Sequence, residues 1–337
     1  MEIKNSLEQR NIGSHGGIIG GHSLFDKIIS LENLFFAWRQ FRRGKRSKHE
    51  VQEFEFNLEN NIFQLHQELK DKTYRHSKYT SLYVTDPKLR HIHKAYIRDR
   101  IVHHAVHNIV YPIFDRNFIH DSYACRLGKG THRAVSRLEE FIAKNGANNT
   151  IPVYYLKCDV RKFFDSISHV VLFDILKLHI FDSETLELLK NIIDSFVHSP
   201  QRGLPLGNLT SQLFGNVYLN EFDHFVKHGL KMRHYIRYCD DFIILSTDVI
   251  KLAEFIPKLS EFLAERLRLE LHPKKVILWK YRQGIDFLGY VILPHHRVLR
   301  TMTKQRLFRK INKENKSSYF GILKHCNGYK IQRLIRF

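Results

Sequence analysis

Two adjacent aspartates, Asp240 and Asp241, interrupt a mostly apolar stretch of this 337-residue sequence. The segments 235–238 before them and 242–246 after them predict two β-strands joined by a tight turn. Two carboxylates this close at a hairpin tip repel each other unless cations lie between them. An Asp-Asp pair alone is often an ordinary turn, so its meaning depends on what the rest of the chain brings to this hairpin.

A third carboxylate, Asp159, stands at the end of another predicted apolar strand, 153–160. If the strands are neighbours in one sheet, the three carboxylates can hold two Mg²⁺ ions roughly 3.5–4 Å apart. That geometry suits in-line phosphoryl transfer, in which one ion lowers the pKa of an attacking hydroxyl and the other holds the leaving pyrophosphate. Mn²⁺ is an alternative ion for the same site.

The charge of the chain points to a polyanionic partner. Lys and Arg number 54 against 34 Asp and Glu, which gives a formal net charge of +20. The basic C-terminal segment, residues 297–336, holds twelve Lys and Arg and only one acid, Glu314, with aromatic residues between them. This pattern favours nucleic acid over the alternative of a solvated cationic surface. The residues expected to contact nucleic acid there are Arg297, Arg300, Lys304, Arg306, Arg309 and Lys310.

Composition excludes several classes of protein. Hydrophobic residues make up 43% of the chain, enough for a buried core, so disorder throughout is excluded. There is no apolar run of the roughly 18 residues that a membrane helix needs, and no apolar N-terminal leader. The four cysteines lack the spacing of a zinc or disulfide framework. We therefore expect a cytoplasmic protein with no membrane partner.

The periodicity of the sequence predicts an α+β fold in which a sheet packs on helices. Residues 1–22 are expected to be a flexible Gly-rich arm, and Ser23 and Ser30 to cap short helices. The expected elements are helices at 49–74 (as one helix), 98–114, 168–179, 183–197, 210–228 and 249–268, a hairpin over 80–93 with its turn near Pro87, strands at 153–160, 235–238, 242–246, 276–279, 286–291 and 297–299, and a helical tail with a break near Asn327-Gly328.

Several spaced motifs together resemble those of reverse transcriptases. They are Asp99-Arg100-Ile101-Val102, the block from Phe118 to Thr131, the first palm aspartate motif from Lys157 to Asp165, Tyr238-Cys239-Asp240-Asp241 as the YxDD box, and Phe287-Leu288-Gly289-Tyr290 as the primer grip. The resemblance covers about residues 25–315 in the correct order. It implies a right-hand polymerase: N-terminal helices and fingers at 23–150, a palm with an antiparallel sheet at 151–292, and a short, basic, helical thumb at 293–337.

The resemblance also implies roles at the reacting end of the site. Asp159 and Asp240 would be the main metal ligands, joined by the backbone of Val160, and Asp241 would add charge or a second contact. Lys275 matches the position where the family often places a lysine near the leaving pyrophosphate, and a general-acid role follows. The alternative for Lys275 is a solvated lysine at the start of a strand.

Five residues are implied to contact the incoming dNTP. Phe164 falls at the steric-gate position that excludes a ribose 2′-OH, although core packing is the alternative. Arg90 and Lys88 would hold the triphosphate through charge-assisted hydrogen bonds. Leu206 and Gly207 belong to the block that lies near the nucleotide.

Other polar residues are given structural or surface roles. Asp165 is expected to cap the following helix rather than bind metal. The pairs His103-His104 and His295-His296 are expected at the surface or facing nucleic acid. Only 47 residues follow Tyr290, so we expect a small helical thumb and no nuclease or integrase domain.

The stretch from Leu206 to Gln212 reads LGNLTSQ, where most reverse transcriptases carry QGxxxSP. This variant resembles diversity-generating retroelement enzymes, which implies error-prone cDNA synthesis from a dedicated RNA. The implied partners are a structured template RNA, a primer or cDNA, dNTPs, and a small basic accessory protein that forms an oligomer. A defence-associated (antiviral) bacterial reverse transcriptase and a maturase-like RNA-binding factor with a vestigial palm are the alternatives.

Overall fold

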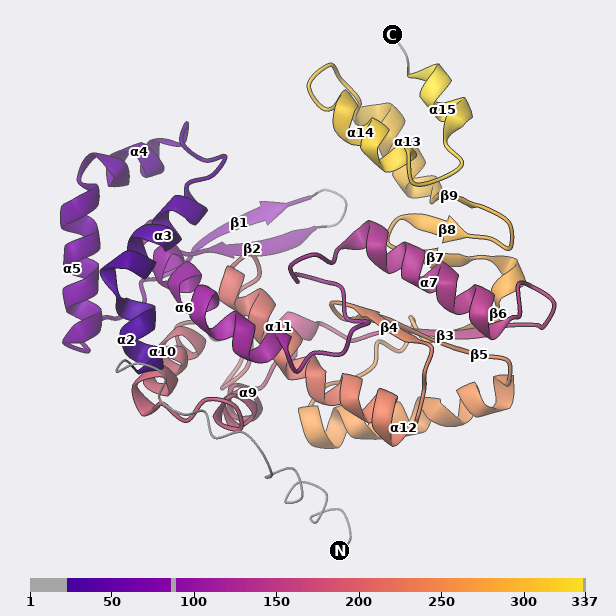
Figure 1. The fold of residues 1–337 in the computed structure, drawn as a ribbon, viewed down its shortest axis with the longest axis horizontal. Coiled ribbons are helices and arrows are strands. Elements are labelled where there is room, and N and C mark those ends of the chain that lie inside the picture. Colours follow the sequence, from indigo (N-terminus) through magenta and orange to yellow (C-terminus); the bar gives the residue numbers. More distant parts are fainter. Residues whose placement is uncertain (1–22, 86–88, 336–337) are drawn as a thin grey trace, which may run out of the picture.

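A computed structural model describes residues 23–85 and 89–335 of the chain. Helices surround three antiparallel sheets in this part of the chain (Figure 1). The expectation of an α+β fold with an antiparallel sheet packed on helices is confirmed. The expected arm, 1–22, lies outside the described residues. None of the described helices is long and apolar enough to cross a membrane.

The central sheet has the strand order β4-β5-β3-β6, and every neighbouring pair is antiparallel. Its strands are β3 (Tyr154–Asp159), β4 (Tyr235–Tyr238), β5 (Asp241–Ser246) and β6 (Ile277–Lys280). Alternate side chains of a strand face opposite sides of a sheet. Leu156 and Cys158 accordingly pack in one hydrophobic core, and Tyr155 packs in a second core.

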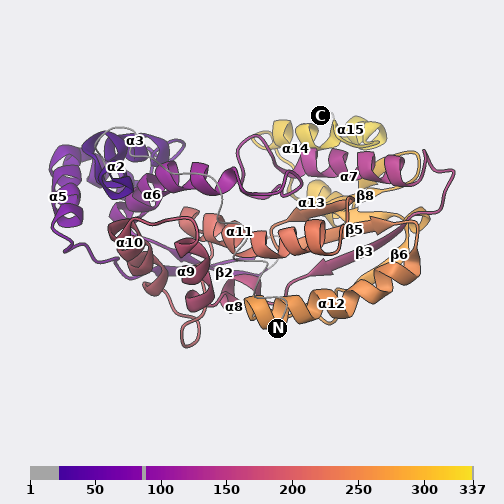
Figure 2. The ribbon, with the colours of Figure 1, turned by 60° about the horizontal axis from the view of Figure 1, so that its bottom comes forward.

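Helices cover both faces of this sheet. The core that contains Leu156 includes side chains from α11 (Leu209–His224) and α12 (Val249–Leu267), whereas the core that contains Tyr155 includes α7 (Thr131–Asn145). In the turned view α12 lies on one side of the sheet and α7 on the other (Figure 2). The sheet is therefore buried on both faces.

The N-terminal helices are α2 (Leu24–Ile29), α3 (Leu31–Phe41), α4 (His49–Phe56), α5 (Leu58–Lys70) and α6 (Ile97–Asp115). Ser23 and Ser30 cap α2 and α3, as predicted. The single helix predicted over 49–74 is wrong, because the chain breaks between α4 and α5 at Asn57, whose φ is −113°. The Asn57 carbonyl accepts the amide of Asn61 and so begins the second helix. Asn favours such breaks because its side chain competes with helical hydrogen bonds.

The predicted hairpin is formed by β1 (Thr80–Val84) and β2 (Arg90–Lys94). Its predicted turn near Pro87 lies outside the described residues. The hairpin is fixed at its base because the His93 amide donates to the Leu206 carbonyl at 3.0 Å. Asn208 Nδ2 donates to the His93 carbonyl at 2.7 Å. The loop before α11 and the hairpin therefore form one unit.

The helices between β3 and β6 are α8 (Phe163–Ser166), α9 (His169–Lys177), α10 (Ser183–Asp194), α11 and α12, and α11 continues into a π turn, η1 (Phe225–Gly229). The predicted helices of this region are confirmed with ends shifted by a few residues. The expected cap role of Asp165 is wrong. Asp165 lies inside α8, and the N-cap of α9 is Ser168, which makes no side-chain capping bond.

The C-terminal part has η2 (Tyr281–Gln283), then β7 (Ile285–Phe287), β8 (Tyr290–Ile292) and β9 (Arg297–Leu299) in a second sheet, followed by α13 (Thr301–Lys310), α14 (Lys316–Leu323) and α15 (Tyr329–Leu334). The single strand expected at 286–291 is wrong, because Leu288 and Gly289 both have positive φ and turn the chain between β7 and β8. The helical tail and its break before α15 are confirmed. The three helices lie across the central sheet from α12 (Figures 1 and 2).

Candidate active site

Asp159 and Asp241 lie opposite each other at the end of the central sheet. They are register partners, the last residue of β3 against the first of β5. The Val160 amide donates to the Asp240 carbonyl at 3.3 Å, which holds the β4–β5 turn against the end of β3. Three carboxylates from two distant parts of the sequence therefore meet at one place.

The surroundings of Asp240 and Asp241 disfavour the charged form of both carboxylates. Burial raises the pKa of Asp241 to about 6, with smaller contributions from the Asp159 and Asp240 carboxylates and an opposing one from Lys157. Burial also raises the pKa of Asp240, and the Asp159 carboxylate adds to that effect. Like charges held together in a poorly solvated place favour protonation unless a cation compensates them.

Two lysines partly compensate the carboxylates. Lys275 Nζ donates to Asp159 Oδ1 at 2.8 Å. Lys157 Nζ lies 3.3 Å from Asp241 Oδ2 and donates to the Asp286 carbonyl at 2.6 Å. The other oxygen, Asp241 Oδ1, is buried without a hydrogen-bond partner within the described residues. The site therefore keeps an unused acceptor beside an excess of negative charge.

Hard divalent cations prefer oxygen ligands of this kind, so the residues fit Mg²⁺ in their chemistry. The fit is incomplete in geometry. Within residues 23–85 and 89–335, no three acidic, histidine or cysteine side chains are gathered into a complete metal site. Lys157 and Lys275 instead bind the carboxylates that a cation would bind.

The sequence interpretation missed a buried arginine behind the hairpin tip. Arg237 has 1% of its surface exposed, and its Nε and Nη2 donate to the two carboxylate oxygens of Asp223 at 2.7 and 2.6 Å. Its Nη1 donates to Asn216 Oδ1 at 3.2 Å and to the Cys239 carbonyl at 2.9 Å. The Asp223 carboxylate raises the pKa of Arg237 against the effect of burial.

This arginine fixes the backbone immediately before the aspartates. Cys239 has φ of +59°, a conformation that residues other than glycine rarely adopt. Asp223 and Asn216 belong to α11, so Arg237 ties that helix to the tip of the β4–β5 hairpin. The sequence feature that could have revealed this role is the position of Arg237 inside an apolar strand, because a buried charge requires a buried partner.

Two of the residues expected near the nucleotide, Leu206 and Gly207, lie where the β1–β2 hairpin meets the loop before α11, and the Phe164 carbonyl accepts the amide of Leu204 in that loop at 2.8 Å. Phe164 is half-buried, and its ring packs edge-on to Phe163 at 5.1 Å between ring centroids. Leu206 bonds the hairpin through its carbonyl. Gly207 has φ of +107°, and a Cβ there would stand 2.7 Å from Ile92 Cγ2. Only glycine therefore fits at that contact.

Two expected triphosphate ligands belong to the hairpin itself. Arg90 is exposed at the first position of β2, opposite Val84. Lys88 lies outside the described residues.

The expected primer-grip residues form the turn between β7 and β8. Phe287 and Tyr290 are buried, with 0% and 2% exposed surface, and anchor the turn. Leu288 and Gly289 form the turn itself and are partly exposed. The Tyr290 hydroxyl donates to the Ile322 carbonyl at 3.1 Å, which links the turn to α14.

The basic C-terminal segment divides into two groups of cations. Arg297 forms an ion pair with Glu139 at 3.4 Å, and Arg300 Nε donates to Asp286 Oδ1 at 2.8 Å. These two arginines attach the segment to the rest of the protein. On α13, by contrast, Lys304, Arg309 and Lys310 are exposed and Arg306 is half-buried.

The expectation that His103 and His104 lie at the surface or face nucleic acid is wrong. His103 is buried, and its Nε2 lies 3.0 Å from His76 Nε2. His104 is partly buried, with its ring against Phe41. The helix α6 that carries them faces the N-terminal core there, so burial of the apolar neighbours buries these rings too. His295 and His296 are exposed, as expected.

Comparison with known proteins agrees with these features. A family model described as reverse transcriptase (RNA-dependent DNA polymerase) matches residues 84–292, which is more than half of the chain. The Group II intron-encoded protein LtrA of Lactococcus lactis subsp. cremoris is 24% identical over 320 residues, covering 74% of this chain and 51% of that protein. Protein YkfC of Escherichia coli (strain K12) is 24% identical over 244 residues, covering 61% of this chain and 64% of that protein. The chain thus spans about half the length of the first relative.

Solved structures show the same fold at low sequence identity. Apo telomerase from Candida tropicalis superposes with a TM-score of 0.53 at 13% identity, covering 74% of this chain and 52% of that one. Telomerase from Candida albicans, in complex with a TWJ fragment of telomeric RNA, gives 0.51 at 12% identity, covering 66% and 46%. The expected right-hand polymerase fold is confirmed. With its sequence match, its fold and its converging aspartates in agreement, the chain belongs to the reverse transcriptase family.

Proposed function

We propose that this chain is an RNA-directed DNA polymerase that makes cDNA from a dedicated RNA template by two-metal nucleotidyl transfer. The observation that carries the proposal is the meeting of Asp159, Asp240 and Asp241 at one end of the central sheet. The raised pKa values of Asp240 and Asp241 and the unused Asp241 Oδ1 support a site that takes up cations when it works.

Asp159 and Asp240 would hold two Mg²⁺ ions, or Mn²⁺, with help from Asp241 and the Val160 carbonyl. When bound, the ions supply activation of the primer hydroxyl and stabilisation of the leaving pyrophosphate. Lys157 orients Asp241 through its ion pair. Lys275, now bound to Asp159, would be released toward the pyrophosphate and donate a proton to it.

The remaining predicted contacts surround these carboxylates. Phe164 would exclude a ribose 2′-OH, and Arg90 with Lys88 would hold the triphosphate against Leu206 and Gly207. The turn at Leu288 and Gly289, supported by the buried rings of Phe287 and Tyr290, would place the primer end. The cations of α13, with Arg297 and Arg300 at its base, would bind the template–primer backbone. Residues 23–150, 151–292 and 293–337 would then act as fingers, palm and thumb.

Primer extension tests the proposal. An RNA template with an annealed DNA primer, Mg²⁺ and dNTPs should give labelled DNA with the intact chain and none with Asp240→Asn. Asp174→Asn is the matched control, because Asp174 has 65% of its side chain exposed on α9 and should leave extension unchanged. Undiminished synthesis by Asp240→Asn would contradict the mechanism.

The Leu206–Gln212 stretch supports assignment to the diversity-generating retroelement group, with frequent errors during cDNA synthesis and a small basic accessory protein as partner. Leucine in place of glutamine removes a polar side chain beside the nucleotide, so base selection relies more on packing. Leu206→Gln should lower the misincorporation frequency of extension products read by deep sequencing. Error spectra unchanged by the substitution would count against this assignment.

A second candidate is a maturase-like RNA-binding factor, because the Lactococcus relative is named as an intron-encoded protein. An anti-phage enzyme would have the same catalytic centre as the first candidate. Sequencing the RNA and cDNA that co-purify with the chain separates the three. A retroelement template, a defence-linked structured RNA, or an intron RNA without cDNA would each identify one function.

A further inference from the structure

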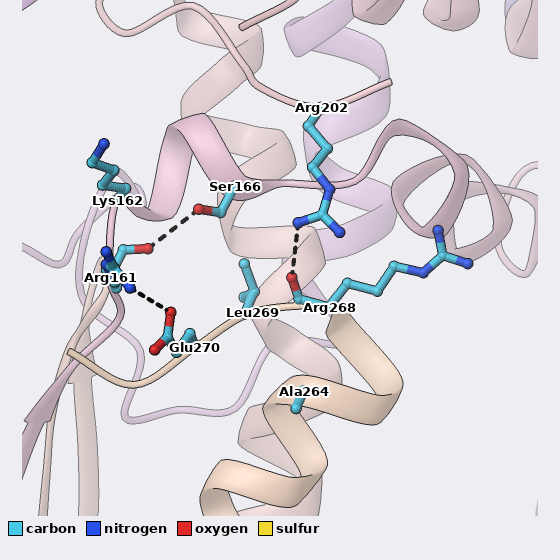
Figure 3. Close-up of a pocket in the computed structure, with 8 residues that line it drawn as sticks. All are labelled: Arg161, Lys162, Ser166, Arg202, Ala264, Arg268, Leu269 and Glu270. Carbon is cyan, nitrogen blue, oxygen red and sulfur yellow. Dashed lines mark hydrogen bonds and ion pairs between the residues drawn. The ribbon is translucent and has the colours of Figure 1, made fainter. Parts of the chain in front are cut away.

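An open hollow of about 490 Å³ lies beyond the end of β3, outside the three aspartates. Its walls come from the turn after β3, from α8, from the loop before α11 and from the end of α12. Arg161 and Lys162 stand on one side of it, and Arg202 and Arg268 on the other (Figure 3). Three segments that are distant in sequence, residues 161–166, Arg202 and residues 264–270, thus contribute to one concave, basic surface.

The charges in this hollow are not balanced. Glu270 is its one acid, and it pairs with Arg161 at 2.9 Å. Over the residues that the structure describes, no acid forms an ion pair with Lys162, Arg202 or Arg268. Cations held together around a hollow repel each other, and a bound anion relieves that repulsion.

Backbone contacts hold the walls in place. The Arg161 amide donates to the Glu270 carbonyl at 2.8 Å, and Ser166 Oγ donates to the Arg161 carbonyl at 3.3 Å. Arg202 Nη1 donates to the Arg268 carbonyl at 3.5 Å, which joins the loop before α11 to the end of α12 on the second side of the hollow. These hydrogen bonds hold the backbone segments that carry the cations in fixed positions.

The chemistry of the lining selects the kind of anion. Its two apolar residues, Ala264 and Leu269, are aliphatic, so no ring is present on which a base can stack. Arginine forks match the oxygens of phosphate in pairs. We propose that this hollow binds phosphate groups, either of free pyrophosphate or a nucleotide triphosphate, or of an RNA strand that passes over this face.

The hollow is next to the catalytic carboxylates but separate from them. Arg161 follows Asp159 by two residues, and the His272 amide donates to the Asp159 carbonyl at 2.8 Å beside Glu270. Phosphate bound here stays close to where pyrophosphate is produced without occupying the metal ligands.

The test measures binding in EDTA, so that metal-bound phosphate at the aspartates does not contribute. Inorganic pyrophosphate is titrated into the protein by calorimetry, and a 12-nucleotide RNA without a 5′ phosphate is titrated in parallel over a range of salt. The test variant is Arg202→Gln with Arg268→Gln. The control is Lys258→Gln with Arg266→Gln, which removes the same charge from exposed positions on α12 outside the hollow.

If pyrophosphate is the source, the test variant should bind it about tenfold more weakly than the control variant does. If RNA is the source, the magnitude of the slope of log affinity against log salt should fall by about 1.4, roughly 0.7 for each lost cation on a single strand, in the test variant alone. The titration in which the test variant differs from the control, with pyrophosphate or with RNA, identifies the ligand. If the two variants behave alike in both titrations, the proposal is wrong. Because no DNA synthesis is measured, this result is independent of polymerase activity, and circular dichroism confirms that each variant is folded.

Discussion

Single residues explain why the β4–β5 turn keeps its shape. Arg237 is fully buried and binds both oxygens of Asp223 while it holds the Cys239 carbonyl. A buried ion pair adds little net stability compared with apolar residues, but removal of one partner leaves the other charged and poorly solvated. The turn that carries the aspartates therefore depends on an arginine that is buried behind it.

Arg237→Gln should lower the free energy of unfolding by about 3–5 kcal/mol, because Asp223 is left buried without its partner. Urea denaturation measures this loss. Lys177→Gln removes an exposed pair with Asp174 and should cost less than about 1 kcal/mol. Equal effects of the two substitutions would show that the buried pair has no special role.

The ionisation of Asp241 sets a pH dependence. Its pKa is raised to about 6 from an ordinary value of 3.8, so the folded chain binds more protons than the unfolded chain between these values. In EDTA, the contribution of Asp241 to stability should therefore fall as the pH rises from about 4 to 6 and then level off. Buried histidines such as His104, whose pKa burial lowers to about 4, contribute the opposite slope. The sign is therefore checked by the difference in denaturation midpoint between the intact chain and Asp241→Asn across this range, and a difference that does not change with pH would contradict the prediction.

Whole elements show how the nucleotide region is assembled. The β1–β2 hairpin is attached to the loop before α11 through His93, Leu206 and Asn208, with Gly207 in direct contact with Ile92. The hairpin and the start of α11 should therefore move together when a nucleotide binds.

Gly207→Ala should displace the hairpin, since the new methyl group would collide with Ile92 at a positive φ. We expect KM for dNTPs in primer extension to rise roughly tenfold, because the collision with Ile92 adds the 1–3 kcal/mol typical of an overpacked contact. Gly130→Ala is the matched control, because Gly130 also has positive φ but nothing lies within 4 Å of its Cβ position. A similar rise in both variants would implicate backbone strain alone.

Local patterns predicted most of these elements, and the errors have physical causes. Short apolar runs were enough for the strands of the central sheet and for the place of Asp159, Asp240 and Asp241. The break at Asn57 and the turn at Leu288 depend on backbone angles that periodicity does not encode. Helix α7 was missed although its apolar residues recur at helical spacing. Arg237 was missed because its partner, Asp223, belongs to another segment.

At the scale of the whole molecule, the basic C-terminal segment lies across the central sheet from α12 (Figure 2). Arg297 and Arg300 attach it through ion pairs, and Lys304 and Arg309 on α13 are exposed. Attachment and the proposed nucleic-acid binding can therefore be separated by mutation.

Lys304→Gln with Arg309→Gln should weaken binding to a template–primer duplex and lower the salt slope of log affinity by about two. Fluorescence anisotropy at several salt concentrations measures both effects. Lys258→Gln, on α12, should change neither. An unaltered slope in the double variant would mean that α13 does not contact the duplex.

Strand β3 is shared by both cores, and this limits how the chain can vary. Its even-numbered residues pack in one core and Tyr155 packs in the other, with Asp159 at its end. One inserted or deleted residue within β3 would exchange the two sets and turn Asp159 away from Asp241. A longer surface loop leaves this spacing unchanged. A shift of one position within β3 instead moves every later side chain of the strand to the opposite face of the sheet.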